Sequence, residues 1–127
     1  MKSVLIVDDS KEYAESVQAV LHKNDFSADI ALDAEACDKA VGNNNYDLII
    51  MDINIYDVDG RQLVLDLHEK YGKKLKNTAF IFASNRKALI NANICEHIIG
   101  VSDYIIKPFT SEELLEVINQ ALSRKQS

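Results

Sequence analysis

Asp47-Leu-Ile-Ile-Met-Asp52 is the stretch that decides the fold of this chain. All residues between its two aspartates are apolar, which is typical of a strand buried on both faces in a parallel sheet. Two similar stretches lie far away in the sequence, namely Leu5-Ile-Val-Asp-Asp9 and Asp103-Tyr-Ile-Ile-Lys-Pro-Phe109. Each is an apolar run that ends at charged residues. Because the carboxyl ends of parallel strands meet in one crevice, we expect these charges to converge there.

The expected convergence brings three carboxylates and one lysine together. Asp8, Asp9 and Asp52 supply the negative charges, and Lys107 supplies the positive charge. Carboxylates at such distances resist full ionisation unless a cation joins them. The sequence therefore predicts a metal site in this crevice, together with an oxyanion that the lysine neutralises.

Length, composition and charge limit the class of protein. A chain of 127 residues, 47% of them apolar, suits a single domain over residues 1–127 with its own core. The net charge of −6 argues against direct nucleic-acid binding. No apolar run approaches the roughly 20 residues of a membrane span, and the N-terminal run is too short for a signal peptide. Cys37 and Cys95 have no metal-ligand spacing, so we interpret them as reduced core residues of a cytoplasmic protein.

Strands and helices are predicted to alternate along the chain, from apolar runs, helical spacings and capping residues. Strands are expected at Val4–Val7, Ser27–Leu32, Asp47–Asp52, Thr78–Ser84 and Val101–Ile106. Helices are expected after Ser10, after Asp33 as far as Gly42-Asn-Asn-Asn45, from Gly60 to Gly72, over Arg86–Ile98, and from a cap at Thr110 or Ser111. Ile53–Asp59 is expected to be a loop, and Lys73–Asn77 a solvated turn. Five β/α units with right-handed crossovers predict an α/β, flavodoxin-like (βα)5 fold, doubly wound around a five-stranded parallel sheet in the order 2-1-3-4-5.

The motifs at the strand ends resemble those of the receiver domain of two-component response regulators. Val4-Leu-Ile-Val-Asp-Asp-Ser10 is similar to that family's first strand and acidic pair. Met51-Asp-Ile-Asn-Ile-Tyr-Asp-Val-Asp-Gly60 is similar to its phosphoacceptor strand and loop. Phe82-Ala-Ser84 stands where the family has a strand ending in threonine or serine, and Gly100-Val-Ser-Asp-Tyr-Ile-Ile-Lys-Pro-Phe109 resembles its last strand. The four motifs occur in family order and cover essentially the whole chain.

The resemblance implies that Asp52 is the phosphoacceptor, whose carboxylate attacks a phosphoryl group and forms an aspartyl phosphate. It also implies a magnesium ion, or manganese in its place, because hard oxygen ligands suit both ions. Asp9 and Asp52 are expected to supply carboxylate oxygens, Asp8 to hold one of the metal's waters, and Asn54 to offer its backbone carbonyl.

Three further residues are expected to respond to the phosphoryl group. Lys107 is expected to neutralise its oxygens, and the bond from Lys107 to Pro108 is expected to be cis. Ser84 is expected to donate its hydroxyl to a phosphoryl oxygen. Tyr104 is then expected to change from an outward to an inward rotamer, as one end of a two-state switch.

The resemblance also implies partners. The phosphodonor is expected to be a sensor histidine kinase or a phosphotransfer protein. A downstream effector domain or protein is expected to bind the face that carries Arg86, Lys87, Tyr104 and Phe109, and a homodimer can form there as well. Met1 stands directly before the first strand, so we expect an N-terminal domain, either as a stand-alone regulator or as part of a multidomain one.

Two positions in this chain depart from the pattern of the receiver domain family. Tyr56 stands where the family usually has proline, and Asn85 stands where it usually has alanine or glycine. Both positions tune reaction rates, so the sequence does not fix the lifetime of the phosphoryl group.

Three other functions compete with the phosphoacceptor function. A phosphorylation-independent interaction domain is one alternative, although it usually lacks one or more of the site residues. An aspartyl phosphohydrolase commonly has an aspartate two residues after the nucleophile, where this chain has Asn54. A flavin or nucleotide module lacks support, because no Gly-rich loop follows the first strand.

Overall fold

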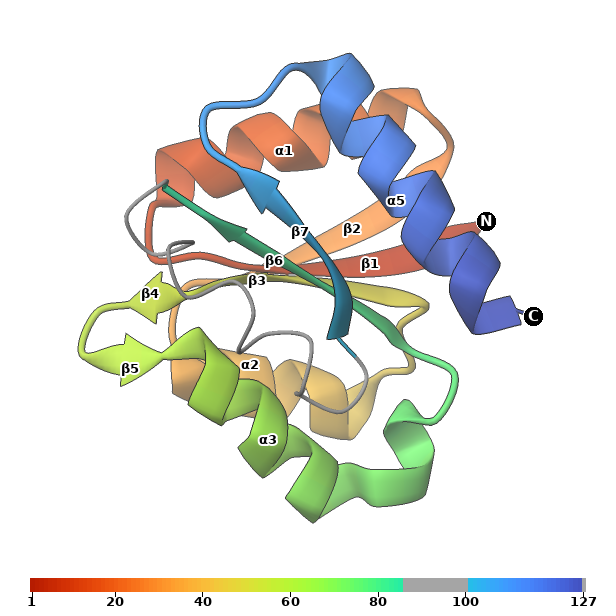
Figure 1. Cartoon of the computed structure of the whole chain (residues 1–127). Coiled ribbons are helices and arrows are strands. Elements are labelled where there is room, and N and C mark those ends of the chain that lie inside the picture. The colour runs from red at the N-terminus through yellow and green to blue at the C-terminus, as the bar shows by residue number, and fades with distance from the viewer. Residues whose placement is uncertain (86–100, 127) are drawn as a thin grey trace.

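The computed structural model describes residues 1–85 and 101–126, whose long strands form one parallel sheet (Figure 1). These strands are β1 (Lys2–Val7), β2 (Phe26–Ala31), β3 (Leu48–Asp52), β6 (Ala79–Ser84) and β7 (Val101–Ile106). They are all parallel and lie in the order β2-β1-β3-β6-β7. Because β6 and β7 are the fourth and fifth strands of this sheet along the chain, the predicted order 2-1-3-4-5 is confirmed.

Helices cover both faces of the sheet. The described helices are α1 (Lys11–Lys23), α2 (Ala34–Asn43), α3 (Gly60–Tyr71) and α5 (Ser111–Gln126). Figure 1 shows α1 and α5 on one face and α2 and α3 on the other. Successive strand residues point to opposite faces, so Val4 and Ile6 of β1 join the core under α1 and α5, whereas Leu5 and Val7 join the core under α2 and α3. A sheet buried on both faces explains the continuous apolar runs.

Short polar side chains begin the helices where the sequence indicates. The side chains of Ser10 and Asp33 each accept a hydrogen bond from the backbone amide three residues further along, at 3.3 Å and 2.7 Å. Of the two candidates for the last helix, Thr110 is the cap. Its hydroxyl accepts the amide of Glu113 and its own amide donates to the Glu113 carboxylate, both at 3.1 Å. This reciprocal pair is a capping box.

Two expected irregular segments contain regular structure. Within Ile53–Asp59, strands β4 (Asn54–Ile55) and β5 (Val58–Asp59) pair as an antiparallel hairpin. This hairpin lies at the end of the sheet where the parallel strands finish (Figure 1). The solvated turn expected over Lys73–Asn77 is largely the 3-10 helix η1 (Gly72–Leu75), and Leu75 is buried against α3 and the sheet. The two hairpin strands and the 3-10 helix have too few residues to show a period in the sequence. In the 3-10 helix, Leu75 packs into the core.

The remaining differences are shifts at element ends. Gly42 belongs to α2 instead of starting the stop signal after it. Thr78 precedes β6, and its buried hydroxyl donates to the carbonyl of Tyr46 at 2.7 Å. The helix expected over Arg86–Ile98, with Cys95, lies outside the described residues. Among the helices in the two described ranges, none has the length and apolar content to cross a membrane.

Candidate functional site

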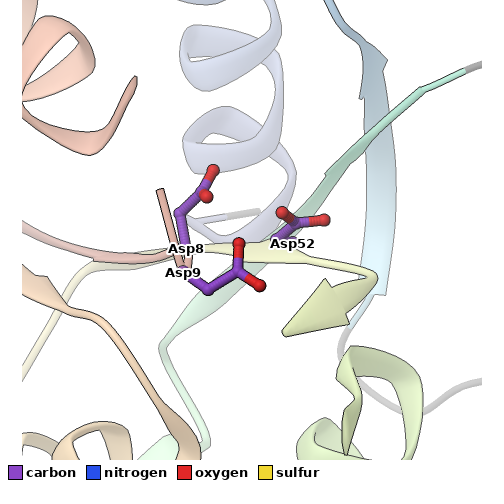
Figure 2. Close-up of side chains that lie close together, drawn as sticks. All are labelled: Asp8, Asp9 and Asp52. Carbon is purple, nitrogen blue, oxygen red and sulfur yellow. The ribbon is translucent and has the colours of Figure 1, made fainter. Parts of the chain in front are cut away.

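The carboxyl ends of β1, β3 and β7 bring the predicted charged side chains together. Asp8, Asp9 and Asp52 each place one carboxylate oxygen within 4.8 Å of the others, and Figure 2 shows the three side chains gathered at one end of the sheet. The Lys107 ammonium donates to Asp8 Oδ2 at 2.7 Å and to Asp52 Oδ2 at 3.1 Å. The convergence expected from parallel strands is therefore confirmed.

Backbone amides hold the three carboxylates in place. Asp8 Oδ1 and Asp52 Oδ1 each accept the amide two residues further along their own loop, at 2.9 Å and 3.0 Å. Asp9 Oδ2 instead accepts the amide of Tyr56 at 2.8 Å, a residue of the β4–β5 hairpin. In Asp8 and Asp52 the second oxygen is thereby left to face Lys107. The backbone after β1 and β3 thus orients the carboxylates of the cluster.

The cluster is electrostatically unbalanced and partly desolvated. Asp8 is 4% exposed and Asp52 is 8% exposed. Burial raises the pKa of Asp52 above its usual value, and Asp8 raises it further, whereas Lys107 and the Asn54 amide act in the opposite direction. Among residues 1–85 and 101–126, the three carboxylates of the cluster have one ammonium group beside them, that of Lys107, so a further cation would stabilise them. Their hard oxygen donors fit a magnesium-type ion.

The other predicted site residues lie at neighbouring strand ends. Ser84 ends β6 and is buried, beside Asp52 because Asp52 pairs with Ala83. The Lys107 amide donates to the Ser84 carbonyl at 2.8 Å, so the backbones of these two residues are joined directly. The peptide bond from Lys107 to Pro108 is cis, which is the geometry expected from the sequence. Tyr104 lies away from the cluster, with 42% of its surface exposed.

The two aromatic residues expected on one partner-binding face line different grooves. Tyr104 lines a groove between β7 and α5. Phe109 lines a groove between α1 and α5, where its ring packs edge-on against Tyr13 with centroids 5.8 Å apart. Arg86 and Lys87, expected on the same face, lie outside the described residues. Of the four residues expected on this face, the two that are described therefore line separate grooves along α5.

Sequence reasoning missed Tyr13 as a residue of the site, and it placed Gly60 in the phosphoacceptor loop without the close contact to Asp52. The Tyr13 ring centroid lies 4.3 Å from the Lys107 ammonium nitrogen. Burial, with the charges of Asp8 and Asp52, raises the pKa of the Tyr13 phenol, which therefore stays neutral. Its place in the first turn after the acidic pair was the available signal. A Cβ at Gly60 would lie 2.0 Å from the Asp52 carbonyl oxygen, so only glycine fits there. The signal for Gly60 was its position at the end of the loop that follows Asp52.

Solved structures of known proteins share this fold. The CheY-like response regulator receiver domain protein of Methanospirillum hungatei JF-1 superposes with a TM-score of 0.86 at 25% identity, covering 99% of this chain and 97% of that one. The response regulator TrrA of Thermotoga maritima, solved in complex with Mg(2+)-BeF, has a TM-score of 0.80 at 24% identity, covering 96% of this chain and 100% of that one. Both likenesses therefore cover nearly the whole chain.

Sequence relatives agree with the structures. The response regulator ArlR of Staphylococcus haemolyticus is 30% identical over 126 residues, which are 98% of this chain and 54% of the relative. The transcriptional regulatory protein TctD of Salmonella typhimurium is 28% identical over 111 residues, covering 87% of this chain and 47% of the relative. The chain thus spans about half the length of these relatives. The family model for the response regulator receiver domain matches residues 4–119. Because that match takes in every strand of the sheet and the acidic cluster, the chain belongs to the receiver domain family of two-component response regulators.

Proposed function

We propose that this receiver domain accepts a phosphoryl group on Asp52 from the phosphohistidine of a sensor histidine kinase or of a phosphotransfer protein. One observation carries the proposal. The Lys107 ammonium bridges Asp8 and Asp52, and Asp9 lies in the same cluster. A nucleophilic carboxylate, the ligands for a cation and a neutralising lysine are the parts that phosphoryl transfer requires.

In the proposed reaction, a carboxylate oxygen of Asp52 attacks the phosphorus atom of the phosphohistidine. The new O–P bond forms as the N–P bond breaks, and the imidazole leaves with the electron pair and takes up a proton. Lys107, 3.1 Å from Asp52 Oδ2, neutralises the phosphoryl oxygens. Ser84, at the end of the next strand, donates its hydroxyl to one of them. One phosphoryl group is accepted per chain, so the domain acts stoichiometrically and not as an enzyme with turnover.

The cation proposed for this site is magnesium, with manganese as a substitute. Asp8, Asp9, Asp52 and the backbone carbonyl of Asn54 would hold it, and it would supply positive charge for the phosphoryl oxygens. The support is the donor set itself. Three carboxylates lie within 4.8 Å of one another, and Asp52 resists ionisation because it is buried.

The proposed output is a change at Tyr104. The β6 and β7 backbones are paired, with Phe82 opposite Tyr104 and Ser84 opposite Ile106. A hydrogen bond from Ser84 to a phosphoryl oxygen would therefore act on the strand that carries Tyr104. Because Tyr104 is exposed, an inward rotamer is a distinct second state. The phosphoryl group would bias the equilibrium between the two states.

We also infer where the domain works and what it binds. Residues 1–127 are proposed to form one receiver domain in the cytoplasm, with an effector domain, an effector protein or a second copy binding the β7–α5 surface around Tyr104. The net charge of −6 supports a protein partner over nucleic acid.

Beryllofluoride with magnesium tests this proposal, because it mimics a phosphoryl group on a carboxylate. Two-dimensional NMR of the wild-type chain is expected to show saturable binding, with amide shifts at the site and around Tyr104. The Asp52→Asn variant is expected to show neither change. Asp66→Asn, the same charge change at an exposed position on α3, is the matched control and is expected to bind like the wild type. Saturable binding by Asp52→Asn, or its absence from the wild type, would contradict the proposal.

A further inference from the structure

Tyr13 contacts the lysine of the site in addition to the two carboxylates. The Lys107 ammonium has two carboxylate partners, Asp8 and Asp52. The Tyr13 ring faces the same nitrogen, with its centroid 4.3 Å away. A lysine ammonium over an aromatic ring within about 6 Å is attracted by the ring quadrupole. Lys107 therefore has a third partner, contributed by α1.

The Tyr13 ring is itself fixed in place. Phe109 packs edge-on against it, with an interplanar angle of 82°. The Tyr13 amide donates to the Ser10 cap of α1, so the residue stands on the first, anchored turn of the helix. Lys107 and Phe109 flank Pro108, so the one ring contacts both sides of the segment that joins β7 to α5. Such a ring is a fixed platform for an otherwise flexible side chain.

A lysine side chain needs a neighbouring group to fix its position more than the planar guanidinium of arginine does. Its ammonium is a point charge on a flexible four-carbon stem, and a point charge selects no direction by itself. The lysine side chain is 20% exposed, so it has room to turn towards solvent. When a phosphoryl group arrives, the ammonium must leave part of its contact with the carboxylates and still remain at the site. The ring contact does not depend on those carboxylates, so it is available throughout that change.

We propose that Tyr13 is a positioning residue that holds the Lys107 ammonium at the phosphoryl site through a cation–π contact. This role rests on the proposed function of Asp52 and assigns a determinant of its rate. An aliphatic residue of similar size at position 13 would fill the same space against Phe109 but would not attract the ammonium. The aromatic ring, and not the hydroxyl, is the required group.

The test compares Tyr13→Phe, which keeps the ring, with Tyr13→Leu, which keeps only apolar volume. Phosphoramidate with magnesium is the phosphodonor. Tyr13→Leu is expected to slow phosphorylation about threefold to tenfold, and Tyr13→Phe to remain within about twofold of the wild type. Tyr13→Met is a second non-aromatic variant, and its flexible side chain fills irregular space if leucine disturbs folding. Equal rates of phosphorylation in the phenylalanine and the non-aromatic variants would overturn the proposal.

A second readout is independent of phosphorylation. The face of an aromatic ring shields nearby protons, so the ε-methylene signal of Lys107 is expected upfield of the same signal in Lys11. Lys11 lies on α1, as Tyr13 does, and 75% of its side chain is exposed. Tyr13→Leu is expected to return the Lys107 signal to the Lys11 position, whereas Tyr13→Phe keeps it upfield. If the wild type takes up no phosphoryl group, the proposed function fails. The Lys107 signal would still show whether the Tyr13 ring contacts the ammonium group. An unchanged Lys107 signal in Tyr13→Leu would refute the positioning role.

Discussion

Replacing Gly60 by alanine probes how closely the start of α3 packs against the phosphoacceptor. An added Cβ would lie 2.0 Å from the Asp52 carbonyl oxygen, 3.0 Å from the Asp52 carbonyl carbon and 3.1 Å from Ile53 Cα. Contacts below 3.0 Å essentially never occur at a real Cβ, so the Asp52 carbonyl must retreat by about 1 Å. These are backbone atoms, and no rotamer change relieves the contact. The strain therefore falls on the residue that carries the reacting carboxylate.

Two effects of different size are expected. Overpacking of a well-packed core costs about 1–3 kcal/mol, and backbone atoms place Gly60→Ala at the upper end, about 3 kcal/mol of unfolding free energy. A displacement of about 1 Å at a reacting group can slow a reaction about a hundredfold, so phosphorylation is expected to fall by that order. Urea unfolding measures the first effect, and the rate of phosphorylation by phosphoramidate with magnesium measures the second.

Gly42→Ala is the matched control for this substitution. The nearest atom to its Cβ is the hydroxyl oxygen of Tyr71, at 2.9 Å on the end of a side chain that can move. Alanine also favours the helix by about 1 kcal/mol, so the net change is expected to stay within about 1 kcal/mol. The reasoning fails if Gly60→Ala unfolds within about 0.5 kcal/mol of the wild type and is phosphorylated at the wild-type rate.

Without magnesium, Asp52→Asn is expected to raise the free energy of unfolding at neutral pH, because burial raises the pKa of Asp52 and its ionised form costs stability. The free energy of unfolding of the wild type is accordingly expected to fall as the pH rises from the ordinary pKa of aspartate to the raised pKa of Asp52. Urea titrations in which Asp52→Asn shows the same fall would contradict this prediction. Tyr56→Pro is expected to lower the free energy of unfolding by about 2 kcal/mol, because proline has no backbone N–H to donate to Asp9 and cannot adopt the φ of +53° found here. Tyr56→Gly keeps the N–H and tolerates this φ, so its change in urea unfolding is expected to stay within about 1 kcal/mol. Cys37 is fully buried and burial raises the pKa of its thiol to about 12, so iodoacetamide should modify it only after unfolding; peptide mass mapping that finds it modified in the native protein would refute this.

The sheet and the charged cluster could be predicted because they depend on simple rules. Parallel strands buried on both faces give uniform apolar runs, and their carboxyl ends must share one end of the sheet. Asp8, Asp52 and Lys107 follow directly after such runs, so their meeting required only the correct strand order. The helix caps Ser10 and Asp33 were equally accessible, since a cap is a local feature of sequence.

Other parts depend on rotations and contacts that a pattern does not contain. The helical spacing of Ala14, Val17 and Leu21 identifies the side of α1 that faces the core. It does not show whether the Tyr13 side chain turns towards Lys107 or towards solvent. The hairpin β4–β5 has two residues in each strand, which is too short for an alternation. Tyr56 adopts a left-handed backbone conformation that is uncommon outside glycine and asparagine, and the bond from its amide to Asp9 joins residues 47 positions apart.

Mapping of the phosphoryl group tests the central claim most directly. The chain is incubated with phosphoramidate and magnesium, the acyl phosphate is trapped by borohydride reduction, and the peptides are analysed by mass spectrometry. The account predicts one modification per chain, at Asp52, which requires magnesium and is lost in Asp52→Asn but kept in Asp66→Asn. Modification at another residue, or none in the wild-type chain, would contradict it.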